Sequence, residues 1–197
     1  MPKSASLLDR REVVARLLGE REGLLVVTGL GSPTYDVHAA GDHDGNFYLW
    51  GAMGSAALIG LGLAQAQPSR NVVVITGDGE QLMGLGGLAT IAISNPDNLV
   101  IIVIDNDHFG ETGMQPSHTG HGLDLATVAQ SCGFAEAHTV RDMAGVEKIA
   151  RVLDSRSSGA RFYAIKVKAE NPPRSLPARD AVYIKNRFRA HLGLGTI

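Results

Sequence analysis

Unbroken apolar runs are the feature that most constrains the fold of this chain. Three of them are LLVVT (24–28), VVVIT (72–76) and LVIIVI (99–104), and the alternating RFYAIKV (161–167) is a fourth strand candidate. A strand without polar alternation is buried on both faces, which is typical of a parallel sheet covered by helices. We therefore expect an α/β fold with a doubly wound, mostly parallel sheet, helices on both faces, and ligands at the carboxyl ends of the strands.

The segments between these runs have helical character. We expect helices at about 5–19, 52–66, 80–94, 123–132 and 143–154, with a further strand at 134–140. Asp142 should cap the last of these helices and Gly133 should end the one before it. The alternation predicts one domain over 1–170, followed in 171–197 by a Pro-rich linker and a short basic helix that packs on this domain or on a partner.

Composition excludes several classes of function. The net charge of −2 gives no positive surface of the kind that nucleic-acid-binding proteins need, so we expect no nucleic-acid partner. The single cysteine, Cys132, cannot form an internal disulfide, and the charged N-terminal segment does not resemble a signal peptide. We therefore expect a cytoplasmic protein.

The run FYLWGAMGSAALIGLGLA (47–64) is long and apolar enough to raise the question of a membrane span. It contains four glycines, follows Asp42-His43-Asp44 closely, and has no Lys or Arg cluster at either edge. These features favour a buried helix of small residues that packs closely on a sheet or a subunit, so we expect no membrane contact.

Polar residues follow the two central strand candidates. Gly77-Asp78-Gly79 comes directly after one, and Asp105-Asn106-Asp107 directly after the other. If the strands are neighbours, both loops leave the same edge of the sheet. A carboxylate and an amide oxygen are ligands that Mg²⁺ accepts while it shares its remaining positions with a diphosphate. The glycines would allow close backbone approach, and a helix starting near Glu80 would add its dipole.

Simpler interpretations exist for each of these residues. Asp78 could serve only as a helix N-cap. His108, His118 and His121 could form a zinc site, although no cysteine or regularly spaced carboxylate accompanies them, so loop histidines are the simpler interpretation. A dinucleotide-binding fingerprint fails because Leu82 occupies the place of the third glycine. A scaffold subunit without catalysis is the non-enzymatic alternative.

Taken together, the motifs resemble a known family. GDGEQLMGLGGLATIAISNPDNLVIIVIDNDHFGETGMQPSHT, the upstream NFYLWGAMG and the terminal YIKNRFRAHLG are similar to the diphosphate-binding domain of thiamine diphosphate-dependent enzymes. Within that family the likeness is to the decarboxylases of sulfopyruvate and phosphonopyruvate, and it covers most of the chain. The resemblance implies thiamine diphosphate and Mg²⁺ as cofactors, and decarboxylation of a small 2-oxoacid as the activity. A carboligase or other C–C lyase with the same cofactor is the alternative.

The resemblance also implies roles for individual residues. Mg²⁺ would be bound by Asp78, by the Asn106 side chain and by the backbone carbonyl of His108. Met53 would support the bent cofactor from below, and the Gly51 carbonyl would accept a hydrogen bond from its aminopyrimidine. The other residues implied to contact the cofactor are Thr28, Gly29, Gly77, Gly79, Glu80, Gly110, Glu111 and Thr112.

This chain departs from the family pattern at three acidic positions. Glu80 stands where relatives often carry a small hydroxyl residue, Glu111 where they often carry threonine, and Asp105 where they usually carry asparagine. Carboxylates beside a diphosphate are unfavourable unless they point away or meet a cation. His118 is the candidate for a catalytic acid or base, or for an anion contact, because imidazole titrates near neutral pH.

Enzymes of this family activate the cofactor with a glutamate from a separate pyrimidine-binding domain. A chain of 197 residues has no room for that second domain. The resemblance therefore implies a partner, a pyrimidine-domain (alpha) subunit in an α2β2 or higher heteromer that supplies the glutamate. The uncharged helix expected at 52–66 would be the subunit contact. A catalytically silent regulatory subunit of the same fold remains the alternative to an active one.

Overall fold

A computed structural model describes residues 7–21 and 23–195, and within them six parallel strands form one sheet in the order β2-β1-β3-β4-β8-β7. The strands are β1 (Leu25–Thr28), β2 (Asn46–Tyr48), β3 (Val72–Gly77), β4 (Leu99–Asp105), β7 (Glu136–Val140) and β8 (Arg161–Lys166). Each pair of neighbours is parallel. The expected parallel sheet is confirmed, and so is the adjacency of the two strands that precede the polar loops.

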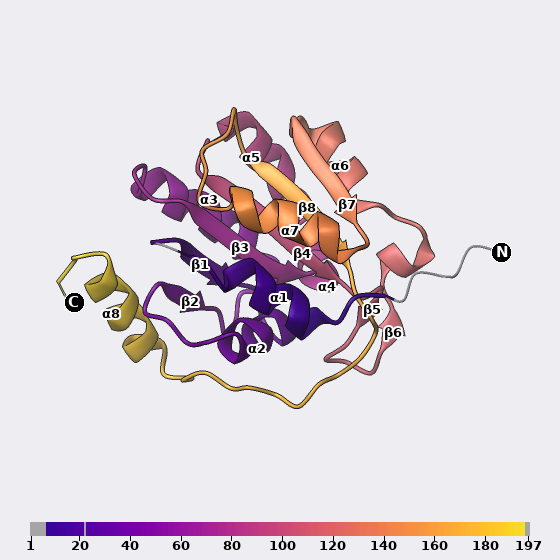
Figure 1. Cartoon of the computed structure of the whole chain (residues 1–197), viewed down its shortest axis with the longest axis horizontal. Coiled ribbons are helices and arrows are strands. Elements are labelled where there is room, and N and C mark those ends of the chain that lie inside the picture. The colour runs from indigo at the N-terminus through magenta and orange to yellow at the C-terminus, as the bar shows by residue number, and fades with distance from the viewer. Residues whose placement is uncertain (1–6, 22, 196–197) are drawn as a thin grey trace.

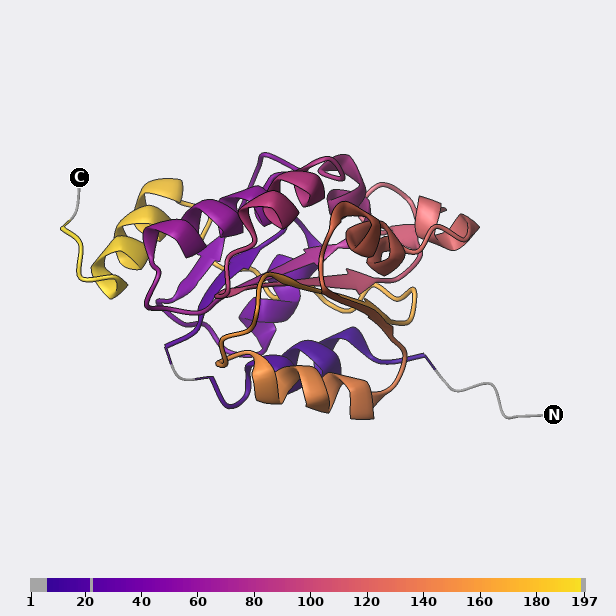
Figure 2. The same ribbon diagram turned by 90° about the horizontal axis from the view of Figure 1, so that it is seen from above.

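Helices cover both faces of this sheet (Figures 1 and 2). One face carries α1 (Arg10–Leu18), α2 (Ser32–Ala39) and α7 (Met143–Val152), and the other carries α3 (Ala56–Ala66), α5 (Gly87–Ser94) and α6 (Leu125–Cys132). The last helix, α8 (Ala181–His191), packs at the β2 edge, where the ring of Phe188 lies edge-on to that of Phe47.

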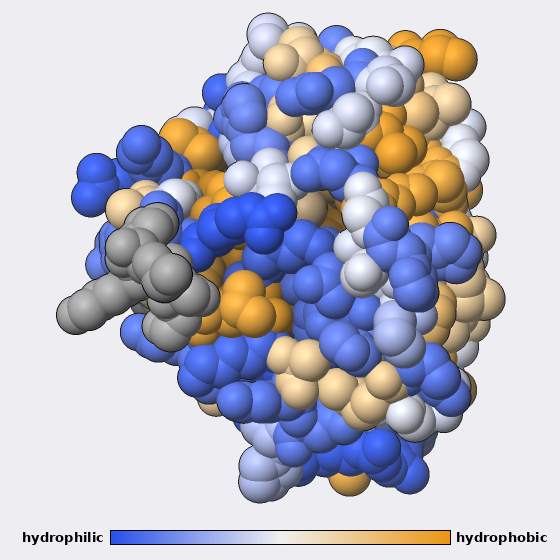
Figure 3. Space-filling view, turned by 90° about the vertical axis from the view of Figure 1, so that its right-hand side faces the viewer, coloured by the Kyte–Doolittle hydropathy of each residue, from blue (hydrophilic) through white to orange (hydrophobic). Residues whose placement is uncertain are grey.

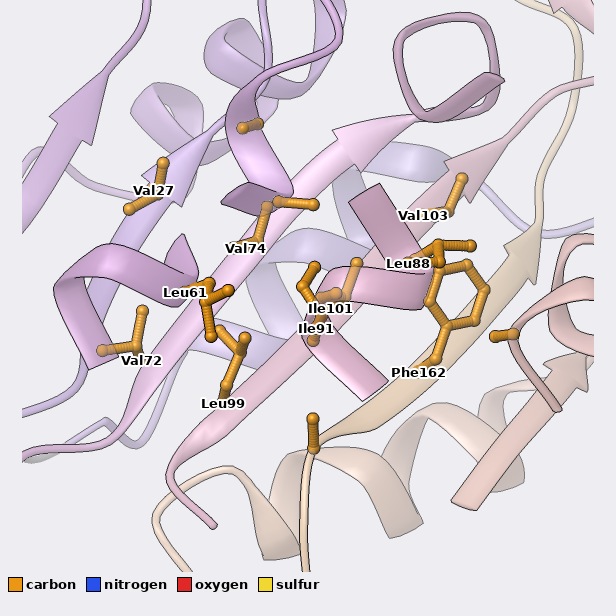
Figure 4. Packing of buried hydrophobic residues seen from close by; sticks show 14 of the residues in the cluster. Val27, Leu61, Val72, Val74, Leu88, Ile91, Leu99, Ile101, Val103 and Phe162 are labelled. Carbon is orange, nitrogen blue, oxygen red and sulfur yellow. The ribbon is translucent and has the colours of Figure 1, made fainter. Parts of the chain in front are cut away.

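The unbroken apolar runs are explained by two separate cores. Successive side chains of a strand point to opposite faces, so Val72 and Val74 of β3 pack under α3 and α5, while Val73 and Ile75 pack under α1 and α2. Figure 4 shows the first of these cores, with Leu61 and Ile91 from the helices packed against β3 and β4. A run that feeds both cores cannot alternate with polar residues.

The predicted helix ends at 133 and 142 are confirmed. Asp142 Oδ1 accepts a hydrogen bond from the backbone N–H of Gly145 at 2.8 Å, which is the N-cap arrangement. Gly133 ends α6 with a φ of 112°, a left-handed conformation that glycine adopts without a steric cost.

The helix expected at 80–94 is instead two helices, α4 (Asp78–Met83) and α5, so that prediction is wrong. The chain breaks at Gly84, where a Cβ atom would lie 2.0 Å from the carbonyl oxygen of Gly54. The turn before α3 therefore approaches α4 more closely than any side chain would allow. With only six residues, α4 also contributes less of a helix dipole than a long helix would.

Other boundaries also differ from expectation. The helix expected at 52–66 begins at Ala56, because Ala52 and Gly54 have positive φ angles of 55° and 91°. The helix expected at 5–19 begins at Arg10, behind the N-cap Asp9, and residues 5 and 6 lie outside the described part of the chain. In the residues described, no helix is both long and apolar enough to cross a bilayer.

Several short elements had no expected counterpart. They are α2, β2, the two-residue strands β5 (His108–Phe109) and β6 (Gln115–Pro116), and the 3-10 helix η1 (His118–His121). The sequence SPTYDVHA of α2 has almost no apolar periodicity and starts with a proline in its first turn, so pattern alone did not predict a helix there. Very short strands carry too few residues to show a period.

After β8 the chain crosses the molecule as a strap, residues 168–180, before it forms α8. Three hydrogen bonds attach the strap to α1, α2 and the segment after β2: Arg11 Nη2 to Pro173 O at 2.8 Å, His38 Nδ1 with Ser175 Oγ at 2.7 Å, and Trp50 Nε1 to Ala178 O at 2.8 Å. The strap thus runs from the end of β8 to the opposite border of the sheet, where β2 and α8 lie (Figure 1).

Two glycines of α3 give a matched test of how closely this helix packs on β3. A Cβ atom on Gly60 would lie 2.2 Å from Cγ2 of Val74, whereas one on Gly62 would meet nothing within 4 Å. Gly60→Ala should therefore lower the free energy of unfolding by about 1–3 kcal/mol through overpacking. Gly62→Ala should raise it by about 0.5–1 kcal/mol through helix propensity. Urea denaturation of the two variants measures both, and equal effects would contradict the close packing of α3 on β3.

Candidate functional site

A pocket opens at the carboxyl edge of the sheet, where the loops after β1, β3 and β4 meet. Ten of the residues predicted for the site line it: Met53, Gly77, Asp78, Gly79, Glu80, Asn106, His108, Gly110, Glu111 and Thr112. Arg10, Leu30, Ser32, Pro33, Ile104 and Phe109 complete the lining. The register explains the convergence, because Gly77 of β3 pairs with Ile104 of β4 and the polar residues follow directly.

Four predicted residues do not line this pocket. Thr28 is buried, with its Oγ1 2.5 Å from Oγ1 of Thr34, and Gly29 lies against Glu80. Gly51 is exposed, and a Cβ atom there would meet nothing within 4 Å among the described residues. His118 lies on η1 with its ring edge-on to that of Phe109, the two centroids 6.4 Å apart. A role for these four residues stays a prediction.

Asp78 is the buried acid at the centre of the site, with 2% of its surface exposed. Its Oδ2 accepts a hydrogen bond from Ser117 Oγ, and Thr119 Oγ1 lies 3.2 Å from the same oxygen. No other side chain among the described residues donates to Oδ1. Burial raises the pKa of Asp78, the hydrogen bond from Ser117 opposes this, and the charge of Asp105 raises it further. The carboxylate is thus held in one orientation, and no Lys, Arg or His of the described residues forms an ion pair with it.

Asp105, the acid at the end of β4, has such a partner. Lys166 ends the adjacent strand β8, and its Nζ lies 2.6 Å from Asp105 Oδ2 and 2.6 Å from Asp107 Oδ1. Burial lowers the pKa of Lys166, but the contacts with Asp105 and Asp107 outweigh this effect and raise it. Thr119 Oγ1 donates to Asp105 Oδ1 at 2.8 Å and so joins this ion pair to Asp78. The departure from asparagine at 105 is therefore balanced by a lysine.

Asn106 and His108 form a tight turn on the other side of Asp78. Asn106 Oδ1 accepts a hydrogen bond from the backbone N–H of His108 at 3.1 Å, and His108 Nδ1 lies 2.8 Å from the Asn106 carbonyl oxygen. An amide oxygen has two lone pairs, so Asn106 can still bind a cation. One carboxylate, one amide oxygen and nearby backbone carbonyls are hard oxygen donors, and this donor set fits a divalent cation of the Mg²⁺ type.

Glu80 lines the pocket but is buried, with 3% of its surface exposed. Its Oε2 accepts a hydrogen bond from Thr76 Oγ1 at 3.0 Å, and a Cβ atom on Gly29 would lie 1.9 Å from the same oxygen. Oε1 makes no hydrogen bond of normal geometry with any described residue. Burial raises the pKa of Glu80, and the hydrogen bond from Thr76 and nearby backbone N–H groups only partly offset this. The carboxylate therefore contacts the loop after β1.

Glu111 meets a cation. Its Oε2 accepts a hydrogen bond from Arg174 Nη2 of the strap at 2.9 Å, and its Oε1 accepts one from Ser32 Oγ at 3.2 Å. The guanidinium of Arg174 also lies over the ring of Tyr35, 5.6 Å from its centroid. The condition under which an extra carboxylate is tolerated beside a diphosphate is thus met at Glu111.

Four side chains that line the pocket or contact its acidic residues were not among the sequence-based predictions: Arg10, Ser117, Thr119 and Lys166. Ser117 and Thr119 belong to the QPSHT stretch, whose proximity to Asp78 depends on the β5–β6 turn and has no local signal. Lys166 is the last residue of a strand adjacent to β4, so strand order was the missing information. Arg10 begins a helix remote in sequence from every motif.

No group of three or more His, Cys, Asp and Glu side chains that could hold a metal ion exists in the part of the chain that the structure describes. The three loop histidines therefore do not come together as a cluster of that kind. The arrangement around Asp78 uses one carboxylate with amide and carbonyl oxygens, which is a different kind of site.

A parallel α/β sheet with glycine-rich loops and an oxygen-donor pocket at its carboxyl edge defines a cofactor-binding domain of the diphosphate-binding type. Comparison with protein families agrees: residues 35–167 match the family described as "Thiamine pyrophosphate enzyme, C-terminal TPP binding domain". The chain belongs to this family.

Two similar proteins are both named decarboxylases. The chain is 37% identical to sulfopyruvate decarboxylase subunit beta of Methanothermobacter thermautotrophicus over 92% of this chain and 94% of that protein. It is 42% identical to phosphonopyruvate decarboxylase of Streptomyces viridochromogenes over 69% of this chain, which is only 34% of that longer protein.

Solved structures support the fold. Benzoylformate decarboxylase from Polynucleobacter necessarius superposes with a TM-score of 0.70 at 17% identity, over 88% of this chain and 35% of that one. 2-Oxoglutarate:ferredoxin oxidoreductase from Magnetococcus marinus superposes with a TM-score of 0.68 at 14% identity, over 96% of this chain and 78% of that one. At these identities the likeness shows the fold alone.

Proposed function

We propose that this chain is the thiamine diphosphate- and Mg²⁺-binding subunit of a 2-oxoacid decarboxylase whose active site is completed by a second chain. The observation that carries the proposal is Asp78, a buried carboxylate beside Asn106 in a glycine-rich pocket, in a chain of the thiamine pyrophosphate family. A buried acid without a cation is unfavourable, and a bound Mg²⁺ would remove that cost.

The residues of the pocket divide between the two ends of the cofactor. Asp78, the Asn106 side chain and the His108 carbonyl would hold Mg²⁺, and the backbones of Gly77 and Gly79 would approach the diphosphate. Met53 would support the bent cofactor, and the Gly51 carbonyl, outside the pocket lining, would accept a hydrogen bond from its aminopyrimidine. When bound, thiamine diphosphate supplies the electron sink for loss of CO₂, and this chain supplies binding and orientation.

A partner chain is supported by the surface near Met53. Met53, Leu58, Met83 and Ile93 are among the large apolar side chains exposed in this chain. Met83 lies close to Gly54 and Leu58 close to Gly87, so α3 is in contact with the α4–α5 region. Figure 3 shows apolar side chains gathered toward one side of a largely hydrophilic face.

Relatives of similar length are named beta subunits. We propose a pyrimidine-domain alpha subunit on this surface, in an α2β2 or higher heteromer, that supplies the activating glutamate.

For the substrate we propose a small 2-oxoacid that carries a second anionic group, such as sulfopyruvate or phosphonopyruvate. The support is the named activity of relatives that share 36–42% identity with this chain. Such a substrate would lose CO₂ from its carboxylate and keep its sulfonate or phosphonate.

Reconstitution tests this proposal. The chain should be purified alone and together with a pyrimidine-domain chain encoded beside it, and CO₂ release from 2-oxoacids should be measured with thiamine diphosphate and Mg²⁺. General acid–base groups contribute about 10²–10⁴-fold to rates, so adding the partner should raise the rate by at least about 100-fold. Full activity of the chain alone would refute the need for a partner. CO₂ release accompanied by products with a new C–C bond would indicate the carboligase alternative, and no cofactor binding at all would indicate a silent subunit.

A further inference from the structure

Arg10, the first residue of α1, is buried in the wall of the cofactor pocket. Only 5% of its surface is exposed, and it lines the same pocket as Asp78 and Gly79. Among the described residues that line this pocket, it is the one arginine or lysine. A cation at this depth needs a partner, because burial of an unpaired charge is costly.

The chain provides Arg10 with a partner for only some of its hydrogen-bond donors and only part of its charge. Arg10 Nε donates to Asp36 Oδ2 at 2.6 Å, and Arg11 Nε donates to Asp36 Oδ1 at 2.6 Å. Asp36 is itself 1% exposed, so two guanidinium groups share one buried carboxylate and a net positive charge remains. No hydrogen bond joins either Nη atom of Arg10 to any described residue, and these atoms are the ones left for a ligand.

The acidic residues of the pocket outnumber its one arginine. Asp78, Glu80 and Glu111 all line it, and of the three only Glu111 forms an ion pair within the described residues. A single Mg²⁺ between Asp78 and a diphosphate would still leave excess negative charge. A guanidinium group offers two parallel N–H donors that match two oxygens of a phosphate, so it suits this need better than a point charge would.

We propose that Arg10 binds the phosphate end of the cofactor through its Nη atoms, as the cationic partner that this chain supplies in addition to Mg²⁺. This inference rests on the proposed function. The phosphate end is favoured over the thiazolium end because the thiazolium ring is positively charged and would repel Arg10. Arg10 also shares its side of the pocket with Ser32 and Gly110, which line both this pocket and the adjoining one, while Met53 marks the apolar part.

The test compares Arg10→Met with Arg11→Met. Both variants remove one guanidinium from Asp36 and leave the other, but Arg11 does not line the cofactor pocket. Titration calorimetry of the chain with its partner would measure affinities for thiamine diphosphate and for thiamine, at fixed Mg²⁺. Arg10→Met should weaken thiamine diphosphate binding by about 10- to 100-fold, the effect of losing hydrogen bonds to a charged group, and leave thiamine binding unchanged. Arg11→Met should change both affinities by less than about threefold.

The possible outcomes distinguish a failure of the proposed function from a failure of the proposed role of Arg10. A wild-type complex that does not bind thiamine diphosphate would overturn the proposed function itself. A wild-type complex that binds, with Arg10→Met binding equally well, would overturn the role of Arg10. Unchanged cofactor affinity with a raised KM for the 2-oxoacid would overturn it too, and would assign the guanidinium to the second anion of the substrate. Arg10→Lys, which keeps the charge and loses the paired donors, should give an intermediate loss if Arg10→Met does not fold.

Discussion

Replacement of Asp78 by alanine should reduce Mg²⁺-dependent binding of thiamine diphosphate by more than about 100-fold. Loss of a residue that merely supports a metal ligand costs about 10–100-fold in affinity, and loss of the ligand itself should exceed this. Asp78 is the one carboxylate in the donor set; it is buried, oriented by a hydrogen bond from Ser117, and without an ion pair among the described residues. Titration calorimetry of the full chain with both cofactors would measure the change.

The same variant should not unfold the protein. Burial and the charge of Asp105 raise the pKa of Asp78, which means that the ionised side chain destabilises the cofactor-free fold. Asp78→Ala should therefore leave the melting temperature without cofactor unchanged or higher. Ser117→Ala is the matched control, because it removes a hydrogen bond to the same carboxylate and should cost about 10–100-fold in affinity. Unchanged cofactor affinity in Asp78→Ala would remove the proposed metal site.

Replacement of Lys166 by methionine should lower the free energy of unfolding by about 3–5 kcal/mol, the cost of breaking a buried ion pair at one partner. Asp105 is 1% exposed and its Oδ2 lies 2.6 Å from Lys166 Nζ, so it would be left as an uncompensated charge in the interior. The side chain of Asp107 is 36% exposed and can return to water. Chemical denaturation at neutral pH would measure the loss.

The double variant Lys166→Met with Asp105→Asn provides the control. Asparagine is neutral and can still accept the hydrogen bond from Thr119, so most of the lost stability should return. A Lys166→Met variant as stable as the wild type would show that the pair is not a buried charge compensation. A double variant as unstable as Lys166→Met alone would assign the loss to packing of the lysine stem.

The sheet and the position of the site were predictable from the sequence, because each depends on a local pattern. Runs such as VVVIT must be buried on both faces, and the GDG and DN turns follow them directly. Parallel neighbours then bring those turns to the same edge, as β3 and β4 do. Elements with little periodicity, such as α2 and β2, and the break at Gly84 could not be predicted, since they depend on contacts such as that between Gly84 and Gly54.

The charges around the site were harder to predict than its motifs. Glu111 and Asp105 stood out as departures from the family pattern, but their partners lie 63 and 61 positions further along the chain. Arg174 and Lys166 carry no local signal of these roles. Only the strand order and the course of the strap bring the charges together. The motif alone suggests that these negative charges are unfavourable, but a cation from a distant part of the chain compensates each of them.

The strap also links the pocket wall to the far border of the sheet. Arg174 grips Glu111 on the pocket wall, and a few residues later the same segment receives the indole N–H of Trp50 and turns into α8 at the far border of the sheet. The carboxyl-terminal region is therefore attached to the domain at two places, at Glu111 on the pocket wall and at Trp50. Trimming the chain behind β8 would therefore remove Arg174 from the pocket wall and would also remove Ile184 and Phe188 of α8, one from each apolar core.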